Sequence, residues 1–123
     1  MSGFMIRKTD SGYSFNLTAD NNKIVGTSQV YSSKPACLKG IESVESNALH
    51  APVEDQTAKD YTTEPNPKFE IFTDKGDEYR FRLKASNGEI ILSSESYTTK
   101  ENCLKAIDSV KYNTIWSDIR EEE

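Results

Sequence analysis

The chain is poor in the residue types that build most metal and catalytic sites, with two cysteines and one histidine among 123 residues. Cys37 and Cys103 lie too far apart to form the CxxC pair used by zinc sites and dithiol redox centres. His50 has no catalytic partner whose position the sequence fixes. None of the six glycines forms a nucleotide-binding pattern. We therefore expect no metal, no cofactor and no catalytic site.

Long apolar runs are also missing, because no stretch approaches the roughly 18 residues that a membrane-spanning helix needs. The N-terminal residues lack the apolar centre of a signal peptide. We expect a cytoplasmic protein with no membrane partner. The formal net charge of -5 argues against a general nucleic-acid binder, because phosphate recognition depends on Lys and Arg. The length and the twelve aromatic residues fit one compact domain over residues 1–123.

What the sequence does contain is an internal repeat, since a shift of 66 positions superimposes its two halves. Ahead of residue 13 the shift is 65, which pairs Phe4 with Phe69. We divide the chain into repeat 1 (4–57), a proline-marked linker (58–68) and repeat 2 (69–123). The matched pairs include Tyr13 with Tyr79, Phe15 with Phe81, Leu17 with Leu83, Cys37 with Cys103, Ile41 with Ile107, and Val44 with Val110.

Each repeat is predicted to begin with three strands. Residues 78–85 alternate strictly between apolar and polar side chains, which places Phe81 and Leu83 on a core face. Asn87-Gly88 favours a type I′ hairpin turn before a return strand that starts at Ile90, and repeat 1 has Asn21-Asn22 at this turn. The apolar segment 69–72 supplies the strand that precedes this hairpin.

A helix follows each meander. In repeat 2, Thr98 and Glu101 have the spacing of a capping box, and an apolar stripe follows. Repeat 1 has Ser32 as the expected cap and Pro35 in the first turn. Gly40 is matched by Ala106, and we interpret it as a tolerated small residue. The stripe of repeat 2 consists of Cys103, Ile107 and Val110, widened by Leu104, and that of repeat 1 of Cys37, Ile41, Val44 and Ala48.

The end of each repeat is less regular. Residues 53–57 can run extended after Pro52. In the matching tail, Tyr112, Ile115, Trp116 and Ile119 fit helical spacing, whereas Ile115, Ser117 and Ile119 would share one face of a strand. Because the two repeats should fold alike, we favour the strand.

The segments 69–72, 79–95, 97–100 and 103–110 resemble the YegP-like family of small bacterial proteins, and the likeness extends over both repeats. The resemblance implies an α+β fold: two tandem β3-α-β repeats forming one antiparallel sheet, with the helices on one face and exchanged C-terminal strands. It implies no activity, because the family is one of uncharacterised function. No site residue is therefore carried over from it.

One polar pattern stands out as a candidate ligand face. Arg80, Arg82 and Lys84 alternate with the core residues of one strand, so they would form a basic stripe on the sheet face opposite the helices. Repeat 1 has Ser14, Asn16 and Thr18 there. The stripe needs counter-charges, supplied either by an acidic or phosphate-bearing partner or by Glu70 and Glu89 on neighbouring strands. Ordinary solvated surface is the alternative interpretation.

The function itself is not identified by the sequence. Our leading hypothesis is a non-catalytic binding module that uses the open sheet face, and we expect a monomer because the second repeat supplies what a one-repeat chain would gain by dimerising. A nucleic-acid contact, with Phe72 stacking beside the arginines, is the second hypothesis. A small enzyme of an unrecognised type is the third. Acidic groups in the turn 74–78 lack the spacing of a calcium-binding loop.

Overall fold

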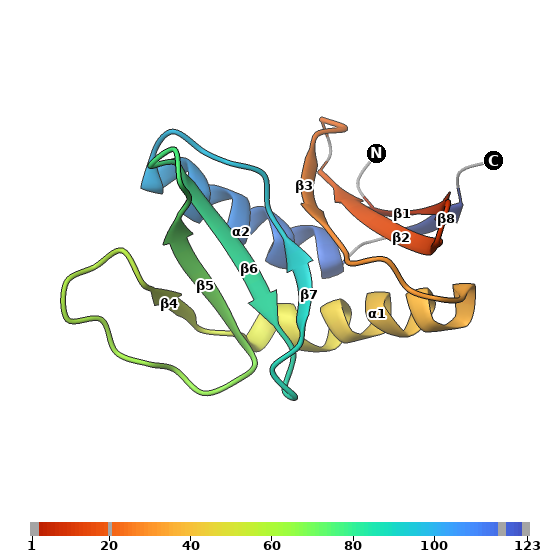
Figure 1. Ribbon diagram of the computed structural model, residues 1–123, viewed down its shortest axis with the longest axis horizontal. Coiled ribbons are helices and arrows are strands. Elements are labelled where there is room, and N and C mark those ends of the chain that lie inside the picture. The colour runs from red at the N-terminus through yellow and green to blue at the C-terminus, as the bar shows by residue number, and fades with distance from the viewer. Residues whose placement is uncertain (1–2, 20, 116–117, 122–123) are drawn as a thin grey trace.

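The computed structural model describes residues 3–19, 21–115 and 118–121. Each repeat contributes three hairpin-linked strands, one helix and a short last strand (Figure 1). The elements of repeat 1 are β1 (Gly3–Thr9), β2 (Gly12–Thr18), β3 (Ile24–Thr27), α1 (Lys34–Asn47), the short 3-10 helix η1 (Ala48–His50) and β4 (Val53–Asp55). Those of repeat 2 are β5 (Lys68–Thr73), β6 (Tyr79–Lys84), β7 (Ile90–Ser93), α2 (Lys100–Ile115) and β8 (Asp118–Glu121).

The strands form one sheet in the order β4-β5-β6-β7-β3-β2-β1-β8. The last strand of each repeat lies beside the first strand of the other, so β4 pairs with β5 and β8 pairs with β1. This is the expected exchange. Both of these pairs are parallel, which makes the sheet mixed rather than purely antiparallel. The short hairpins within each repeat permit only antiparallel neighbours, whereas the long loop 56–67 between β4 and β5 permits a parallel one. Strands β1 and β8 are the first and last of the described strands, so no hairpin constrains their direction either.

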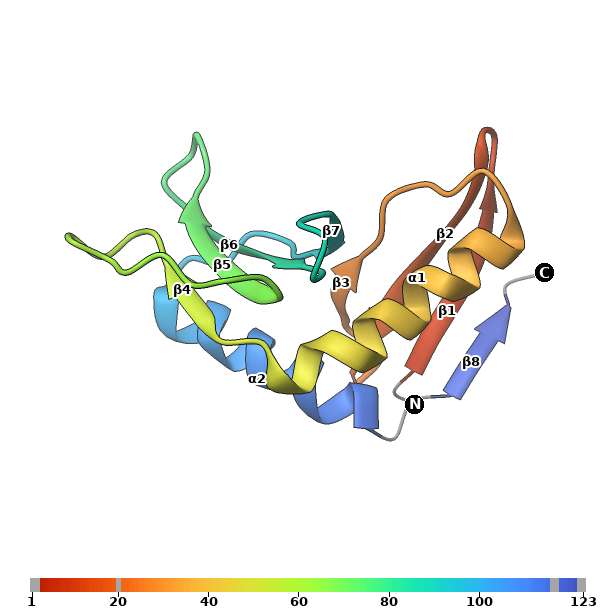
Figure 2. The ribbon, with the colours of Figure 1, turned by 90° about the horizontal axis from the view of Figure 1, so that it is seen from below.

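Both helices lie against the same face of the sheet (Figure 2), and the core fills the space between them and the strands. Phe4 packs edge-on against Phe15, with ring centroids 5.5 Å apart, and Phe69 packs against Phe81 in the same way at 5.8 Å. These pairs confirm the core face predicted from the alternation. Both helical stripes are buried as predicted, except that Leu104 is 39% exposed because it follows Cys103 and is rotated by about 100° around the helix.

The helix caps are each displaced by one residue from the prediction. Ser33, not Ser32, caps α1, because its side-chain oxygen accepts a hydrogen bond from the backbone N–H of Ala36 at 3.2 Å. In repeat 2, Thr99 accepts from the backbone N–H of Asn102 at 3.1 Å, so the cap is not Thr98. Adjacent hydroxyl residues can each cap a helix, and only the residue whose backbone is extended at the helix start is positioned to do so.

The hairpin turns also differ from the predicted type I′. Gly88 has a φ of 84° and Asn22 a φ of 65°, but Asn87 is not in the left-handed region. The N–H of Ala85 donates to Glu89 and the N–H of Gly88 donates to Ala85, which closes a loop of three residues rather than two. A type I turn followed by one left-handed residue has this geometry, and it needs a permissive residue only at its third position.

The tail of repeat 2 contains both a helical part and a strand, the two structures that its pattern allowed. The helix α2 continues to Ile115, and β8 then occupies Asp118–Glu121, which confirms the expected last strand. Trp116 and Ser117 lie outside the described residues.

The two halves of the sheet meet at a narrow seam. Strands β3 and β7 are joined through Thr27 and Ser93, which are the same position in the two repeats. The pseudo-two-fold axis of the molecule therefore passes between them. Gly26 and Leu92 are also equivalent positions, and a Cβ built on Gly26 would lie 2.5 Å from the Cγ of Leu92. The seam can admit one leucine only because its counterpart is glycine.

We predict that Gly26→Ala destabilises the protein by about 1–3 kcal/mol, because the added methyl group overpacks the side chain of Leu92. Urea unfolding followed by circular dichroism measures this change. In the double variant Gly26→Ala/Leu92→Ala the methyl group has room. The destabilisation of the double variant should therefore be smaller than the sum of the destabilisations of the two single variants. Strict additivity would show that Gly26 is not selected by its contact with Leu92.

Candidate functional site

The predicted basic stripe lies on the open face of repeat 2, where β6 turns Arg80, Arg82 and Lys84 away from the core. Phe81 and Leu83, between them, are buried. Phe72 lies opposite Arg80 on the neighbouring strand β5. The guanidinium carbon of Arg82 sits 4.5 Å from the centre of the Phe72 ring, a cation–π contact. The four residues predicted as a ligand face are therefore brought together.

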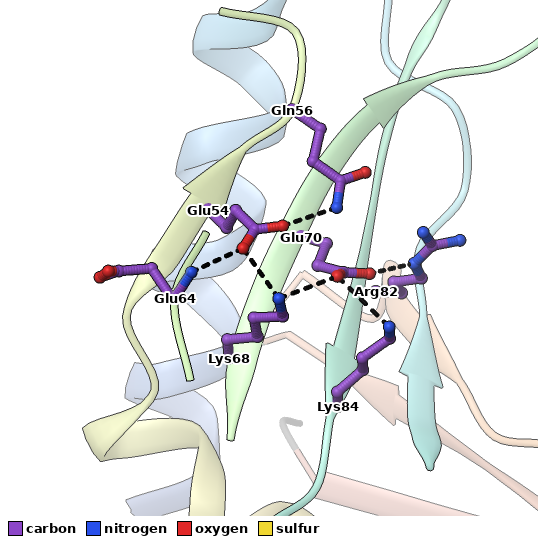
Figure 3. Close-up of polar contacts among 7 residues, drawn as sticks. All are labelled: Glu54, Gln56, Glu64, Lys68, Glu70, Arg82 and Lys84. Carbon is purple, nitrogen blue, oxygen red and sulfur yellow. Dashed lines mark hydrogen bonds and ion pairs between the residues drawn. The ribbon is translucent and has the colours of Figure 1, made fainter. Parts of the chain in front are cut away.

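The counter-charge for most of the stripe is Glu70 of β5, which lies directly opposite Arg82. Its Oε1 accepts from the Nε of Arg82 at 2.6 Å, and its Oε2 lies 3.3 Å from the Nζ atoms of both Lys68 and Lys84 (Figure 3). One carboxylate thus faces three cations. Of the two acids predicted as possible counter-charges, Glu70 pairs with the stripe. Glu89 is exposed at the hairpin end.

The end of the stripe at Arg80 is held by the β5–β6 turn. Asp74 Oδ2 accepts from Arg80 Nε at 2.7 Å, while its Oδ1 accepts the backbone N–H groups of Gly76 and Glu78. The hydrogen bond from Arg80 is the main cause that lowers the pKa of Asp74. Asp74 therefore organises its own turn and fixes the guanidinium of Arg80.

The exchanged strand β4 adds Glu54 to this group of charges. Its Oε1 accepts from Lys68 Nζ at 2.8 Å and from the backbone N–H of Glu64 in the linker at 2.7 Å. Its Oε2 accepts from the side chain of Gln56 at 2.6 Å (Figure 3). The ionic cluster, as we name it, consists of Glu54, Lys68, Glu70, Arg82 and Lys84.

Three members of the ionic cluster are almost inaccessible to solvent: Glu54 and Glu70 are each 2% exposed and Lys68 is 7% exposed. Burial opposes the charged form of Glu54, but the hydrogen bonds from Gln56, Lys68 and Glu64 outweigh it and lower its pKa from 4.5 to about 2. The stability that this carboxylate contributes is therefore present above pH 4.5 and is lost as the pH falls toward 2. For Lys68, the hydrogen bond to Glu54 raises the pKa.

Repeat 1 has no equivalent of the ionic cluster among its described residues. Met5 stands where repeat 2 has Glu70, and Asn16 stands where it has Arg82. The side chain of Asn16 accepts from the hydroxyl of Thr27 at 3.1 Å, and the hydroxyl of Thr18 donates to the carbonyl of Gly3 at 3.2 Å. In this half the open face carries Arg7 opposite Ser14 and Arg120 opposite Met5. The two halves therefore differ in the charged residues that they present, and the ionic cluster belongs to the other half.

The remaining candidates lie apart from this face. His50 is exposed at the end of η1. The thiols of Cys37 and Cys103 are fully buried in the core, and burial raises both pKa values, that of Cys103 to about 11. Within residues 3–19, 21–115 and 118–121, no three His, Cys, Asp or Glu side chains cluster as metal ligands would. No helix in the same residues is long and apolar enough to cross a membrane.

Sequence reasoning missed Glu54 and Lys68 as parts of the site. Glu54 belongs to an acid-rich connecting segment, and Lys68 falls at the end of the linker as we divided it. The available signal was the alternation of Val53, Glu54 and Asp55, which places Glu54 alone on one face of a short strand.

Comparison with known protein families finds one family model that matches the chain twice. The family model described as a domain of unknown function, DUF1508, matches residues 9–55 and again residues 74–121. The chain belongs to this family. One matched segment lies within each repeat, which confirms both the tandem duplication and the family resemblance. A UPF0339 protein of Pseudomonas aeruginosa is 30% identical over 120 residues, which are 97% of this chain and 96% of that protein.

Other relatives match one repeat. A UPF0339 protein of Agrobacterium fabrum is 55% identical over 51 residues, which cover 42% of this chain and 82% of the relative. Among solved structures, the solution structure of the protein of unknown function yegP from E. coli has a TM-score of 0.80 at 30% identity, covering 98% of this chain and 92% of that one. A UPF0339 protein from Shewanella oneidensis has a TM-score of 0.79 at 27% identity, with the same coverage. These relatives support the α+β fold, and none indicates a specific function.

We predict that Lys68→Met destabilises the protein by about 3–5 kcal/mol, because it leaves the carboxylates of Glu54 and Glu70 buried with less compensation. Denaturant unfolding at neutral pH measures the loss. Lys105→Met is the matched control, since Lys105 forms an exposed pair with Glu101 and its loss should cost no more than about 1 kcal/mol. Equal effects of the two substitutions would show that the ionic cluster contributes no more than ordinary surface charge.

Proposed function

We propose that this protein is a non-catalytic binding module whose open sheet face in repeat 2 contacts an acidic or phosphate-bearing partner. The supporting observation is how the two arginines of the stripe are held. Arg80 is bound by Asp74 and Arg82 by Glu70, in each case through Nε. The outer nitrogens of Arg82 point away from Glu70 in Figure 3. Each arginine is fixed by its own acid and keeps its two terminal nitrogens for a ligand.

Fixed guanidinium groups suit anion recognition. Arginine binds carboxylate or phosphate through two parallel hydrogen bonds, and prior ordering reduces the entropy that binding costs. The side chains of Arg80 and Arg82 are 41% and 30% exposed, so a partner can reach them. The ion pairs of this face join four cations to three acids, so the paired groups include one more cation than acid. The cations are Lys68, Arg80, Arg82 and Lys84, and the acids are Glu54, Glu70 and Asp74.

A nucleic-acid contact through the same stripe has weaker support. Base stacking requires a free aromatic face, and Arg82 covers one face of the Phe72 ring. The overall charge of -5 also opposes an RNA or DNA backbone. A small enzyme has still less support, because the two thiols are buried in the core and His50 has no described catalytic neighbour.

We predict that a hexaglutamate peptide and a phosphoserine peptide shift the amide and arginine Nε–H signals of residues 70–72 and 80–84 in NMR titrations. Arg80→Ser, which installs the residue that repeat 1 has at this position, should weaken binding about tenfold. Lys75→Ser is the matched control, because it removes one positive charge from the adjacent turn without touching the stripe. It should change the affinity less than about twofold.

The same titration separates the competing functions. A decauridine RNA that binds the stripe more tightly than either peptide would replace our proposal with the nucleic-acid one. Shifts confined to the helices or the linker, with the strand around Arg82 unchanged, would leave the stripe as ordinary solvated surface.

We further propose that the protein is a cytoplasmic monomer. Both exchanged strands find their partners within one chain, so no strand must be supplied by a second copy. The two unpaired cysteines fit a reducing compartment.

We predict a single species of 13.9 kDa in light scattering at micromolar concentration. A stable species of twice this mass would contradict the monomer.

A further inference from the structure

Two grooves lie on the helix side of the molecule, and the pseudo-two-fold axis relates them. Each is formed by the central hairpin of one repeat and the helix of the other. The first lies between the β2–β3 hairpin and α2, and the second lies between the β6–β7 hairpin and α1. No residue of the basic stripe lines either groove, so these surfaces are separate from the one discussed above.

The two grooves differ in size although their walls are equivalent. The first encloses about 880 Å³ and the second about 210 Å³. Small-molecule sites usually measure about 300–1,000 Å³, so only the first is large enough for a ligand of that kind.

One substitution between the repeats accounts for this difference. In the small groove, the ring of Tyr31 lies over Gly40, where an added Cβ would be 2.6 Å from the ring carbon that carries the hydroxyl. Tyr31 also stacks on Phe15, with ring centroids 6.4 Å apart and planes 8° apart. In the large groove the equivalent residues are Tyr97 and Ala106. The methyl group of Ala106 occupies the space that Tyr31 uses, so Tyr97 cannot close its groove in the same way.

The large groove also has a different charge. Lys23 on the hairpin and Lys105 on the helix line it, and Glu95 is its one acid among the described lining residues. Lys105 also forms an exposed pair with Glu101 at 3.4 Å. In the small groove, Glu89 replaces Lys23 and faces Lys39. Among the described residues, the large groove therefore combines an apolar floor of Val25, Tyr97 and Ala106 with two lysines, whereas its counterpart has one lysine and one acid at the same positions.

We propose that the large groove is a binding site for a small molecule that joins a flat apolar body to one carboxylate or phosphate group. The flat body would lie against Tyr97 and Ala106, and the anionic group would lie between Lys23 and Lys105. Both walls are needed, so the site exists only where the two repeats meet.

The test uses 2-naphthoate as the probe and 2-naphthamide as its uncharged match, each titrated into the full chain and followed by amide shifts. We expect 2-naphthoate to shift residues 21–25 and 102–109 with a Kd below about 1 mM. The amide should bind at least about fivefold more weakly, because it cannot pair with the two lysines.

Three variants locate the site. Lys23→Glu gives the large groove the charge of its counterpart and should weaken 2-naphthoate binding at least about tenfold. Lys39→Glu makes the same charge reversal in the small groove and should leave the affinity unchanged. Ala106→Gly gives Tyr97 the space that Tyr31 occupies and should reduce binding of both probes.

The proposal is overturned if 2-naphthoate gives no saturating shift, if naphthamide binds equally well, or if the shifts map to residues 31–43. Equal effects of Lys23→Glu and Lys39→Glu would also overturn it, because they would indicate general attraction to positive charge. If Ala106→Gly does not fold, the two charge reversals still decide the outcome.

Discussion

The exchange of the last strands is the constraint on which the whole molecule depends. At the centre of the sheet the repeats are joined through the single pair of Thr27 and Ser93, which is a weak seam. At the edges, β4 adds three residue pairs with β5, and β8 adds four with β1. Each exchanged strand is also tied to the start of the other repeat's helix, Asp55 to Lys100 at 2.8 Å and Glu121 to Lys34. Because these ties occupy equivalent positions, neither repeat can leave without breaking both edges of the sheet.

The exchange also makes each half of the open face a joint product of both repeats. The ionic cluster lies on repeat 2, but Glu54 comes from repeat 1 and one of its hydrogen bonds comes from the linker backbone at Glu64. A buried charge is tolerated only when it is paired and hydrogen-bonded. Without β4 beside β5, Lys68 would lose Glu54, which is the nearer of its two carboxylate partners. The pairing of Lys68 with both carboxylates therefore depends on the strand exchange, whereas the pair of Arg82 and Glu70 forms within repeat 2.

What could be predicted from the sequence follows from periodicity. Phe81 and Leu83 alternate with Arg80 and Arg82, and that alternation alone separates the core from the stripe. The partners of the stripe could not be predicted in this way, because they depend on the register between β5 and β6 and on a strand that arrives from the other repeat. The caps were misplaced by one residue for a similar reason. Neighbouring hydroxyl residues share the same propensity, and the backbone angle at the helix start selects one of them.

A tandem chain can place different residues at equivalent positions of its two repeats, which a symmetric pair of one-repeat chains cannot do. In a symmetric dimer each residue near the axis faces its own copy, so Gly26 against Leu92 would become glycine against glycine or leucine against leucine. The same restriction would give both grooves either Gly40 or Ala106, and both open faces either Asn16 or Arg82. Relatives whose length is close to one repeat would be limited to such symmetric surfaces if they paired. Fusion of the repeats removes that limit. The buried residues stay matched because both halves must pack alike, whereas the two grooves and the two halves of the open sheet face are free to differ in the charged residues that they carry.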